Sequence, residues 1–316
     1  MEDQGASNSE RPFTDKEFMA LFRDNIYLSR EFAEIVAKSL KMRLGTAKIG
    51  TKTVCTLNTK TAGLHAYTGI ECDELEQQGI HYGAVLNQDN NHAKRQSMKE
   101  YALLACRPYP AVRKDYRKQF RNQVVQAERN GLKVEALTTN SAGFIRQRNI
   151  AFQIYRQAIR KHKSFCMPRE LCDAMSAMTG AKVWLCKTDE RIISYAIALE
   201  NRENIYISLQ GSDSSAMHLR PSNRIYDTII ARAMDERKNV HCGCGLRGEG
   251  YQRFKMSTGF TMLSVREPRH AATLRDLGHS IIKTPLLNDV IGLLANLAAM
   301  TPSMRRALIQ LYVPFT

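Results

Sequence analysis

The chain has 316 residues, of which 43% are hydrophobic and 24% are charged, and this composition excludes an intrinsically disordered protein. No apolar run reaches the length of a membrane-spanning helix, and the polar N-terminus MEDQGASNSE does not resemble a signal peptide, so we expect a cytoplasmic protein. A chain of this length forms one large domain or two of ordinary size.

The net charge of +15 is concentrated in one segment. Residues 94–163 contain 17 Lys and Arg against four acids, a balance of +13. A surface this basic indicates a polyanionic partner such as RNA, a nucleotide-linked substrate or an acidic lipid. A solvated helical face explains the charge equally well.

The N-terminal part of the chain is expected to carry helices followed by short strands. Residues 1–12 indicate a disordered tail, and the capping box at 14–17 predicts a helix start. A second helix fits 31–43. Turn residues separate the predicted strands 52–58, 63–68, 80–86 and 101–107.

A single basic helix is predicted over residues 111–130, where Val112, Tyr116, Phe120 and Val124 form an apolar stripe. Its cations would crowd the helix N-terminus, where the macrodipole disfavours positive charge by a few tenths of a kcal/mol each. An anion docking there would relieve that cost, although solvent screening can make the cost trivial. The candidate polyanion-binding residues are therefore Arg113, Lys114, Arg117, Lys118 and Arg121.

The second half of the chain mixes helices with an antiparallel meander. Tight turns link three predicted strands, and a helix beginning near Pro221 then crosses over to a further strand. An amphipathic C-terminal helix is marked by the leucines of 286–297. The predicted elements, in order, are strand 133–137, helix 142–163, a helix from 168 to 180, strands 182–187, 191–199 and 204–209, helix 222–238, strand 240–243, helix 251–256 and strand 261–265.

Four features stand out within this order of elements: a basic helix ending at Gly131, the meander residues Tyr206 and Gly211, Arg220-Pro221-Ser222-Asn223 at a helix start, and Phe254-Lys255-x-x-x-Gly259-Phe260. With these features the order of elements resembles a GNAT acyltransferase domain, and residues 111–265 look most like the Fem-type (FemAB-like) branch of acyl and aminoacyl transferases.

The resemblance implies an α+β, GNAT-like fold, with a mixed, mostly antiparallel sheet flanked by helices. It also implies two GNAT-like halves. The first would be a degenerate half over 13–138, and the second a transferase domain with C-terminal helices over 139–316.

Two departures from the family pattern leave the donor molecule open. GNAT domains that bind coenzyme A usually offer a glycine-rich pyrophosphate loop, but the connector 211–220 has one glycine. The branch also tends to carry Asp-Phe-Gly-Gly on the strand after the helix, where this chain has His241-Cys242-Gly243-Cys244-Gly245.

The helix start near Pro221 is the first candidate site, because a helix N-terminus presents unpaired N–H groups and a positive dipole end. Ser222 and Asn223 lie there between Arg220 and Arg224, so an anionic or carbonyl oxygen would be stabilised. The alternative is that Ser222 and Asn223 only cap the helix.

Lys255 is the candidate catalytic residue, since a lysine among aromatic residues can bind phosphate or stabilise developing negative charge. Losing such a group costs about 2.7–4 kcal/mol of barrier. The alternative is a lysine that snorkels to the surface. Glu249 and Asp213 are the carboxylates best placed to accept a proton, without a clear preference. The remaining candidate substrate-binding residues are Arg247, Tyr251 and Tyr206, with Arg253 as a further phosphate ligand.

No metal site is expected. His241-Cys242-Gly243-Cys244 supplies ligand types, but a second Cys/His pair is not close in sequence. The eight cysteines are expected to be reduced thiols.

The resemblance implies an N-acyltransferase or aminoacyltransferase that forms an amide bond on an amine. The donor is expected to be an acyl-CoA or carrier thioester or an aminoacyl-tRNA, without a covalently bound cofactor. The acceptor is expected to be a peptide, a cell-wall precursor or a small metabolite amine. The alternative is a catalytically inactive GNAT-like module that binds RNA.

Overall fold

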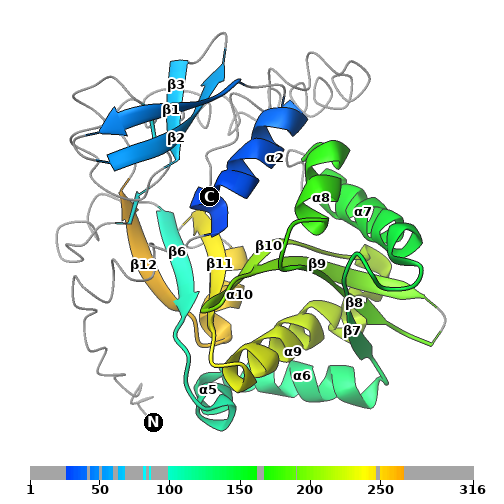
Figure 1. Ribbon diagram of the computed structural model, residues 1–316. Coiled ribbons are helices and arrows are strands. Elements are labelled where there is room, and N and C mark those ends of the chain that lie inside the picture. The colour runs from blue at the N-terminus through cyan, green and yellow to red at the C-terminus, as the bar shows by residue number, and fades with distance from the viewer. Residues whose placement is uncertain are drawn as a thin grey trace, which may run out of the picture.

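The computed structural model describes residues 26–40, 43–49, 52–59, 63–67, 81–82, 85–86, 99–161, 167–189, 191–246 and 250–266. Its centre is an eight-stranded sheet (Figure 1). Of its neighbouring strand pairs only β10–β11 is parallel, and the others are antiparallel. In spatial order the strands are β5 (Val85–Leu86), β12 (Thr261–Arg266), β6 (Lys99–Leu104), β11 (Asn239–Leu246), β10 (Asn204–Ser212), β9 (Ile192–Glu200), β8 (Ala181–Lys187) and β7 (Lys133–Leu137).

Helices cover both faces of this sheet (Figure 1). One face carries the 3-10 helix η1 (Ile26–Leu28) with α2 (Arg30–Leu40), α7 (Phe144–Lys161) and α8 (Arg169–Ser176). The other carries α5 (Tyr109–Asp115), α6 (Lys118–Arg129) and α9 (Pro221–Asp235). After β11 comes α10 (Gly250–Ser257).

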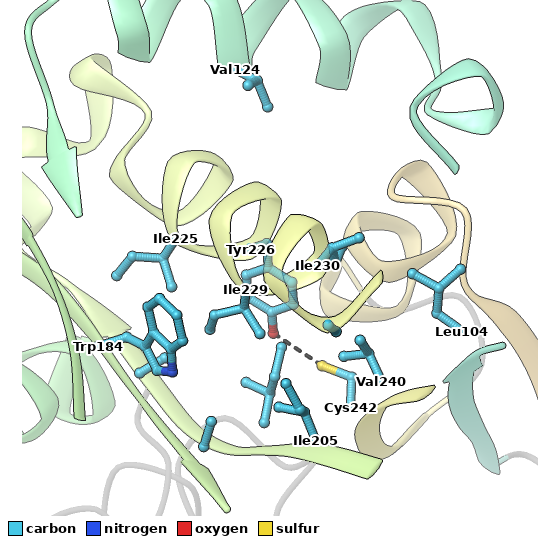
Figure 2. Packing of buried hydrophobic residues seen from close by; sticks show 14 of the residues in the cluster. Leu104, Val124, Trp184, Ile205, Ile225, Tyr226, Ile229, Ile230, Val240 and Cys242 are labelled. Atoms are coloured by element: carbon cyan, nitrogen blue, oxygen red, sulfur yellow. Dashed lines mark hydrogen bonds between the residues drawn. The ribbon is translucent and has the colours of Figure 1, made fainter. Parts of the chain in front are cut away.

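Along each strand the side chains belong alternately to two hydrophobic clusters, because successive side chains point to opposite faces of the sheet. On β8, Val183 and Leu185 belong to the cluster under α7 and α8. Trp184 and Cys186 belong to the cluster under α9, where Figure 2 shows Ile225 and Ile229 packing toward the sheet. Both faces are therefore buried, and β8 and β9 are largely apolar along their length.

A second, four-stranded sheet comprises β1 (Arg43–Ile49), β2 (Lys52–Thr59), β3 (Gly63–Tyr67) and β4 (His81–Tyr82), in that order. Its β3–β4 pair is parallel and the others are antiparallel.

The predicted α+β, GNAT-like architecture is confirmed, including the β8–β9–β10 meander, helix α9, strand β11 and helix α10. Strand β1 was not predicted. The strand expected over 80–86 is two short strands, β4 and β5, which belong to different sheets. The predicted tail 1–12, the helix at 14–17 and the C-terminal helix at 286–297 lie outside the described residues.

The single helix predicted over 111–130 is wrong, because the chain leaves helical geometry at Tyr116 (ψ 133°) and Arg117 (ψ 144°). The Arg117 N–H binds the Ser257 carbonyl of α10 at 3.0 Å instead of a helical carbonyl. The apolar stripe survives the break, since Val112, Tyr116, Phe120 and Val124 are all buried.

The break also changes the electrostatic reasoning for this segment. Arg113 and Lys114 lie in the last turn of α5, where the macrodipole favours cations. Only Arg117 and Lys118 stand at a helix N-terminus, that of α6.

The division at residue 138 stays a prediction. Strands β6 and β7, which it assigns to the first half, pair with β11, β12 and β8 of the second. Within the described ranges, none of the helices is long and apolar enough to span a membrane.

Candidate active site between strands β10 and β11

The two parallel strands part after three residue pairs, of which the last is Tyr206–His241. Both strands are irregular at this point. The register of β10 against β9 shifts between Ile207 and Leu209, which leaves Ser208 as an extra residue, and β11 shifts against β6 between His241 and Cys244. Bulges of this kind redirect side chains and release backbone groups from the ladder.

A buried hydrogen-bond network around His241 lies where the β10–β11 pairing ends, which we call the base of the parting strands. Asn239 Nδ2 donates to Asn204 Oδ1 at 3.1 Å, so this oxygen is an acceptor and His241 Nε2, 3.0 Å away, carries a proton. His241 Nδ1 then accepts from the Tyr101 hydroxyl at 2.8 Å. Burial lowers the pKa of His241 to about 3, so the ring is neutral at physiological pH.

Tyr206 is part of this base. Its ring stacks on His241 with centroids 4.5 Å apart, and the residue is fully buried. Its side chain therefore packs in the core beneath the parting strands.

Lys255 is fully buried, which rules out the snorkelling alternative. Its Nζ donates to the Gly243 carbonyl at 3.1 Å and lies 4.2 Å from the Tyr251 ring centroid. Gly243 has a φ of 60° inside the β11 bulge, a conformation that favours glycine. The bulge turns this carbonyl toward α10, and the lysine binds it.

A cluster of two hydroxyls and a thiol lies beside Lys255. The Tyr226 hydroxyl is 3.1 Å from Cys242 Sγ, a contact drawn in Figure 2, and 3.0 Å from the Tyr251 hydroxyl. Burial raises the pKa of both tyrosines well above 10, so each phenol keeps its proton at neutral pH. Tyr251 is 42% exposed, yet its hydroxyl points inward to Cys242 and Tyr226.

Ser222 directs its hydroxyl into the protein. Ser194 Oγ donates to the Gly211 carbonyl at 2.8 Å, so its contact with Ser212 Oγ at 2.7 Å uses the Ser212 proton. Ser212 must then accept from Ser222 at 2.8 Å, while Gln210 donates to Ser222. The hydroxyl proton of Ser222 is thus used internally, and its backbone N–H remains as the group that a ligand can use.

Arg220 precedes α9 in the left-handed region, with φ 62° and ψ 42°. For a residue with a Cβ this conformation costs about 1–2 kcal/mol. Among the described residues its side chain makes no capping hydrogen bond to the helix. The first turn of α9 therefore keeps the unpaired amides that every helix start has.

Asn223 and Arg224 face α6. Asn223 Nδ2 donates to Gln123 Oε1 at 3.0 Å, and Arg224 Nη1 lies 2.9 Å from Glu128 Oε1. These bonds tie α9 to α6, a role that the sequence did not suggest.

The basic residues adjoin the candidate site through α10. Phe120 of α6 packs against Phe254 of α10 with ring centroids 5.6 Å apart, and Arg117 binds Ser257. Lys114, Arg117, Lys118 and Arg121 are exposed, Arg113 is half-buried, and Arg253 is exposed on α10. We call these six residues the basic surface.

The remaining candidates from the sequence are Asp213, Arg247 and Glu249, and the structure describes only the first. Asp213 accepts from the Ser215 N–H at 2.9 Å and pairs with Arg191 at 2.6 Å. Arg247 and Glu249 lie outside the described residues, as does the Cys244 side chain. Within the described part of the chain, His, Cys, Asp and Glu do not gather in a group of three or more suited to a metal ion.

Sequence reasoning missed Cys242 and Tyr226. Cys242 was considered only as a metal ligand or strand end, and Tyr226 is one of several apolar positions on α9. The one signal was the His-Cys-Gly-Cys-Gly pattern on β11, where glycines mark a bulge.

Comparison with known proteins identifies the fold. The chain is similar to the solved structure of FemX, with a TM-score of 0.56 and 10% identity over 80% of this chain and 94% of that one. It is also similar to L-PGS from Bacillus licheniformis, with a TM-score of 0.51 and 12% identity over 85% and 97% of the two chains.

A third similar structure, from Agrobacterium fabrum, is the DUF2156 domain assigned to the C-terminus of a lysylphosphatidylglycerol synthetase. Its TM-score is 0.54, with 10% identity over 79% of this chain and 91% of that one. No protein-family model and no curated protein sequence matches the chain. The chain has the Fem-type GNAT-like fold. The predicted resemblance is thus confirmed at the level of the fold.

Proposed function

We propose that the protein is a transferase that joins an acyl or aminoacyl group to an amine at the site between β10 and β11. The observation that carries this proposal is Lys255, fully buried and bonded to the Gly243 carbonyl where β11 bulges. A buried ammonium is costly unless charges or hydrogen bonds compensate it, so a lysine is an uncommon residue at such a position. The fold shared with FemX supports the same reaction class.

The reaction would be attack of the amine nitrogen on the carbonyl carbon of an ester or thioester. A C–N bond forms, the C–O or C–S bond breaks, and the leaving group takes up the proton that the amine loses. The barrier falls when the two reactants are held in position and the oxyanion is stabilised.

Three groups are suited to these tasks. Backbone N–H groups of β10 beyond Tyr206 and of the first turn of α9, including those of Ser222 and Asn223, can bind the carbonyl oxygen. The Lys255 ammonium supplies positive charge beside Tyr251, whose hydroxyl contacts Tyr226 of α9. Tyr251 keeps its proton at neutral pH, and it can relay a proton by giving its own to the leaving group while it takes up the proton that the amine loses.

We favour an aminoacyl-tRNA as donor. The connector before α9 forms a 3-10 helix, η2 (Ser214–Leu219), in place of a glycine-rich loop for coenzyme A pyrophosphate. The basic surface beside α10 suits an RNA backbone. A peptide, a cell-wall precursor or a small metabolite amine remains as the acceptor class, and Arg220 and Arg224 remain candidate ligands for an anionic substrate group.

Lys255→Met tests the catalytic assignment, because methionine fills the buried space without the charge. We expect turnover to fall about 10²–10³-fold while the thermal midpoint stays close to wild type. Turnover is measured by mass spectrometry of products from aminoacyl-tRNA or acyl-CoA with a panel of amines.

The matched control is Lys187→Met, which removes a lysine that bonds Glu135 and Gln147 on the β7–β8 edge. It should keep wild-type turnover. Full activity of Lys255→Met would refute the role of the lysine.

The donor is tested by charge reversal on the basic surface. Arg117→Glu, Lys118→Glu and Arg121→Glu together should weaken tRNA binding and flatten its salt dependence. The control reverses three exposed cations elsewhere, Arg156, Lys161 and Arg202, with the same change in net charge. Equal losses in the two triple variants would mean nonspecific attraction.

A catalytically inactive RNA-binding module is the second candidate, and the basic surface is the observation that favours it. In that case tRNA binding would persist in Lys255→Met, and the wild-type protein would not release a transfer product with any donor.

A further inference from the structure

Tyr27 reaches the candidate site from a segment 181 positions away in sequence. Its hydroxyl lies 2.7 Å from Ser208 Oγ, and its ring packs edge-on against Tyr206, with centroids 5.4 Å apart. Tyr27 belongs to η1, and it is buried, with 8% exposure. Figure 1 shows η1 and α2, in blue, lying over the ends of the central strands.

The direction of the hydrogen bonds follows from the single proton of each hydroxyl. Ser208 Oγ donates to the Tyr206 carbonyl, which can only accept, at 3.4 Å. Tyr27 is therefore the donor in the shorter bond to Ser208. These two hydrogen bonds link Tyr27 to Ser208 and Ser208 to the Tyr206 carbonyl. They therefore join the extra residue of the β10 bulge to the last residue that pairs with β11.

The hydrogen bond between Tyr27 and Ser208 holds the β10 backbone at its bulge. Ser208 is outside the regular ladder with β9, and in the described parts of β10 and β11 the parallel pairing has already stopped at Tyr206. Two of the constraints that normally fix a strand residue are therefore missing here. The Tyr27 hydroxyl supplies a replacement from the opposite half of the chain.

Tyr27 and the hydroxyl cluster approach the parting strands from opposite faces of the sheet. The pKa of Tyr251 is raised chiefly by burial and by Cys242, and the nearby Tyr27 adds to the rise. Tyr27 and Tyr251 thus approach the parting strands from η1 and α10, on two sides of the site.

We infer that Tyr27 is a positioning residue of the transferase site, which fixes the β10 bulge through Ser208 so that its backbone can bind the donor carbonyl. This role rests on the proposed function. Tyr27 acts through Ser208 and does not itself take part in the bond changes. The N-terminal segment is thereby a component of the site.

The test compares Tyr27→Phe with the wild-type chain in the aminoacyl-tRNA and acyl-CoA assays described above. Phenylalanine keeps the ring contacts with Tyr206 and Phe32 and removes only the hydroxyl. We expect kcat to fall about tenfold or more with an unchanged donor KM, because the bulge acts in the transition state. Ser208→Ala should lose as much, and the double variant should lose no more than either single variant.

Tyr109→Phe is the matched control, since it loses a phenol bond of similar length, 2.6 Å to Asp227, on the α5–α9 side. Its kcat should equal the wild-type value. Hydrogen–deuterium exchange gives a second readout, and the amides of 207–212 should exchange faster in Tyr27→Phe than in Tyr109→Phe.

The outcomes separate the two hypotheses. Wild-type turnover that persists unchanged in Tyr27→Phe would overturn the positioning role alone, as would unchanged exchange at 207–212. A wild-type chain that is inactive with every donor would overturn the proposed function and this role with it.

Discussion

The β10–β11 pair has a paired end, where Asn204 to Tyr206 pair with Asn239 to His241, and a parting end, where the strands continue beyond that pairing. The two ends bury polar groups of different kinds. At the paired end, the Glu200 carboxylate contacts Lys182 at 2.8 Å, Arg232 at 3.1 Å and Lys238 at 3.5 Å. At the parting end, the buried groups are the hydroxyls and thiol around Tyr251, and a lysine that donates to a backbone carbonyl.

The two ends also differ in the regularity of their strand pairing. The paired end has a continuous ladder from β8 to β11. The parting end has two bulges. Positive φ values occur at both ends, at Gly243 (60°) and Arg220 (62°) near the parting strands and at Gly180 (76°) and Arg237 (57°) near the paired end. Strained and unpaired backbone persists where the surrounding structure fixes it. The paired end is therefore the part that stabilises the fold, and the parting end is the part available for chemistry.

Removing the charge at the paired end should lower the stability of the fold. Glu200→Gln removes this counter-charge from Lys182, while Arg232 and Lys238 keep Glu236 as a partner. We expect the free energy of unfolding to fall by about 1–3 kcal/mol. Urea denaturation at pH 7.5 measures the loss. A loss below about 1 kcal/mol would mean that the ion pairs at this end do not stabilise the fold.

Two glycines with positive φ sharpen the comparison. At Gly180 (φ 76°) an added Cβ would overlap the Glu200 carbonyl oxygen, so Gly180→Ala should cost about 3 kcal/mol or more. At Gly243 (φ 60°) such a Cβ would have no heavy atom of the described residues within 4 Å, so Gly243→Ala should cost about 1–2 kcal/mol. The two thermal midpoints report the difference. Equal losses would show that the parting end is packed as tightly as the paired end.

The sequence predicts the paired end better than the parting end, for a physical reason. Apolar runs and tight turns specify the meander β8–β10, and a proline at its first position specifies α9. These are local signals. The break between α5 and α6 has no such signal, because the Ser257 carbonyl that stabilises it lies on another element.

The candidate site shows the same limit. The motif around Lys255 makes the residue a candidate, but only the packing of α10 on β11 shows that it is buried. The direction of the Ser222 hydroxyl depends on Ser194 and Ser212, and the bond of Tyr27 to Ser208 joins residues from opposite halves of the chain. Contacts over such separations do not appear in local patterns.

The histidine between the two ends provides the smallest effect. Burial lowers the pKa of His241 to about 3, below the 6.5 of an exposed histidine, so the folded state favours the neutral ring. Its contribution is fully present above pH 6.5 and is lost as the pH falls toward 3. The loss is about 1.4 kcal/mol per pH unit, or about 2 kcal/mol at pH 5.

His241→Gln removes this titration, so its unfolding free energy should fall less than that of the wild type between pH 7.5 and pH 5. His218→Gln, at an exposed histidine on η2, should keep the wild-type slope. Denaturant titrations at the two pH values measure both. Identical slopes for all three proteins would mean that His241 accepts a proton in the fold. In that case the hydrogen bonds of His241 to Tyr101 and Asn204 open readily, and His241 belongs with the parting end and not with the paired end.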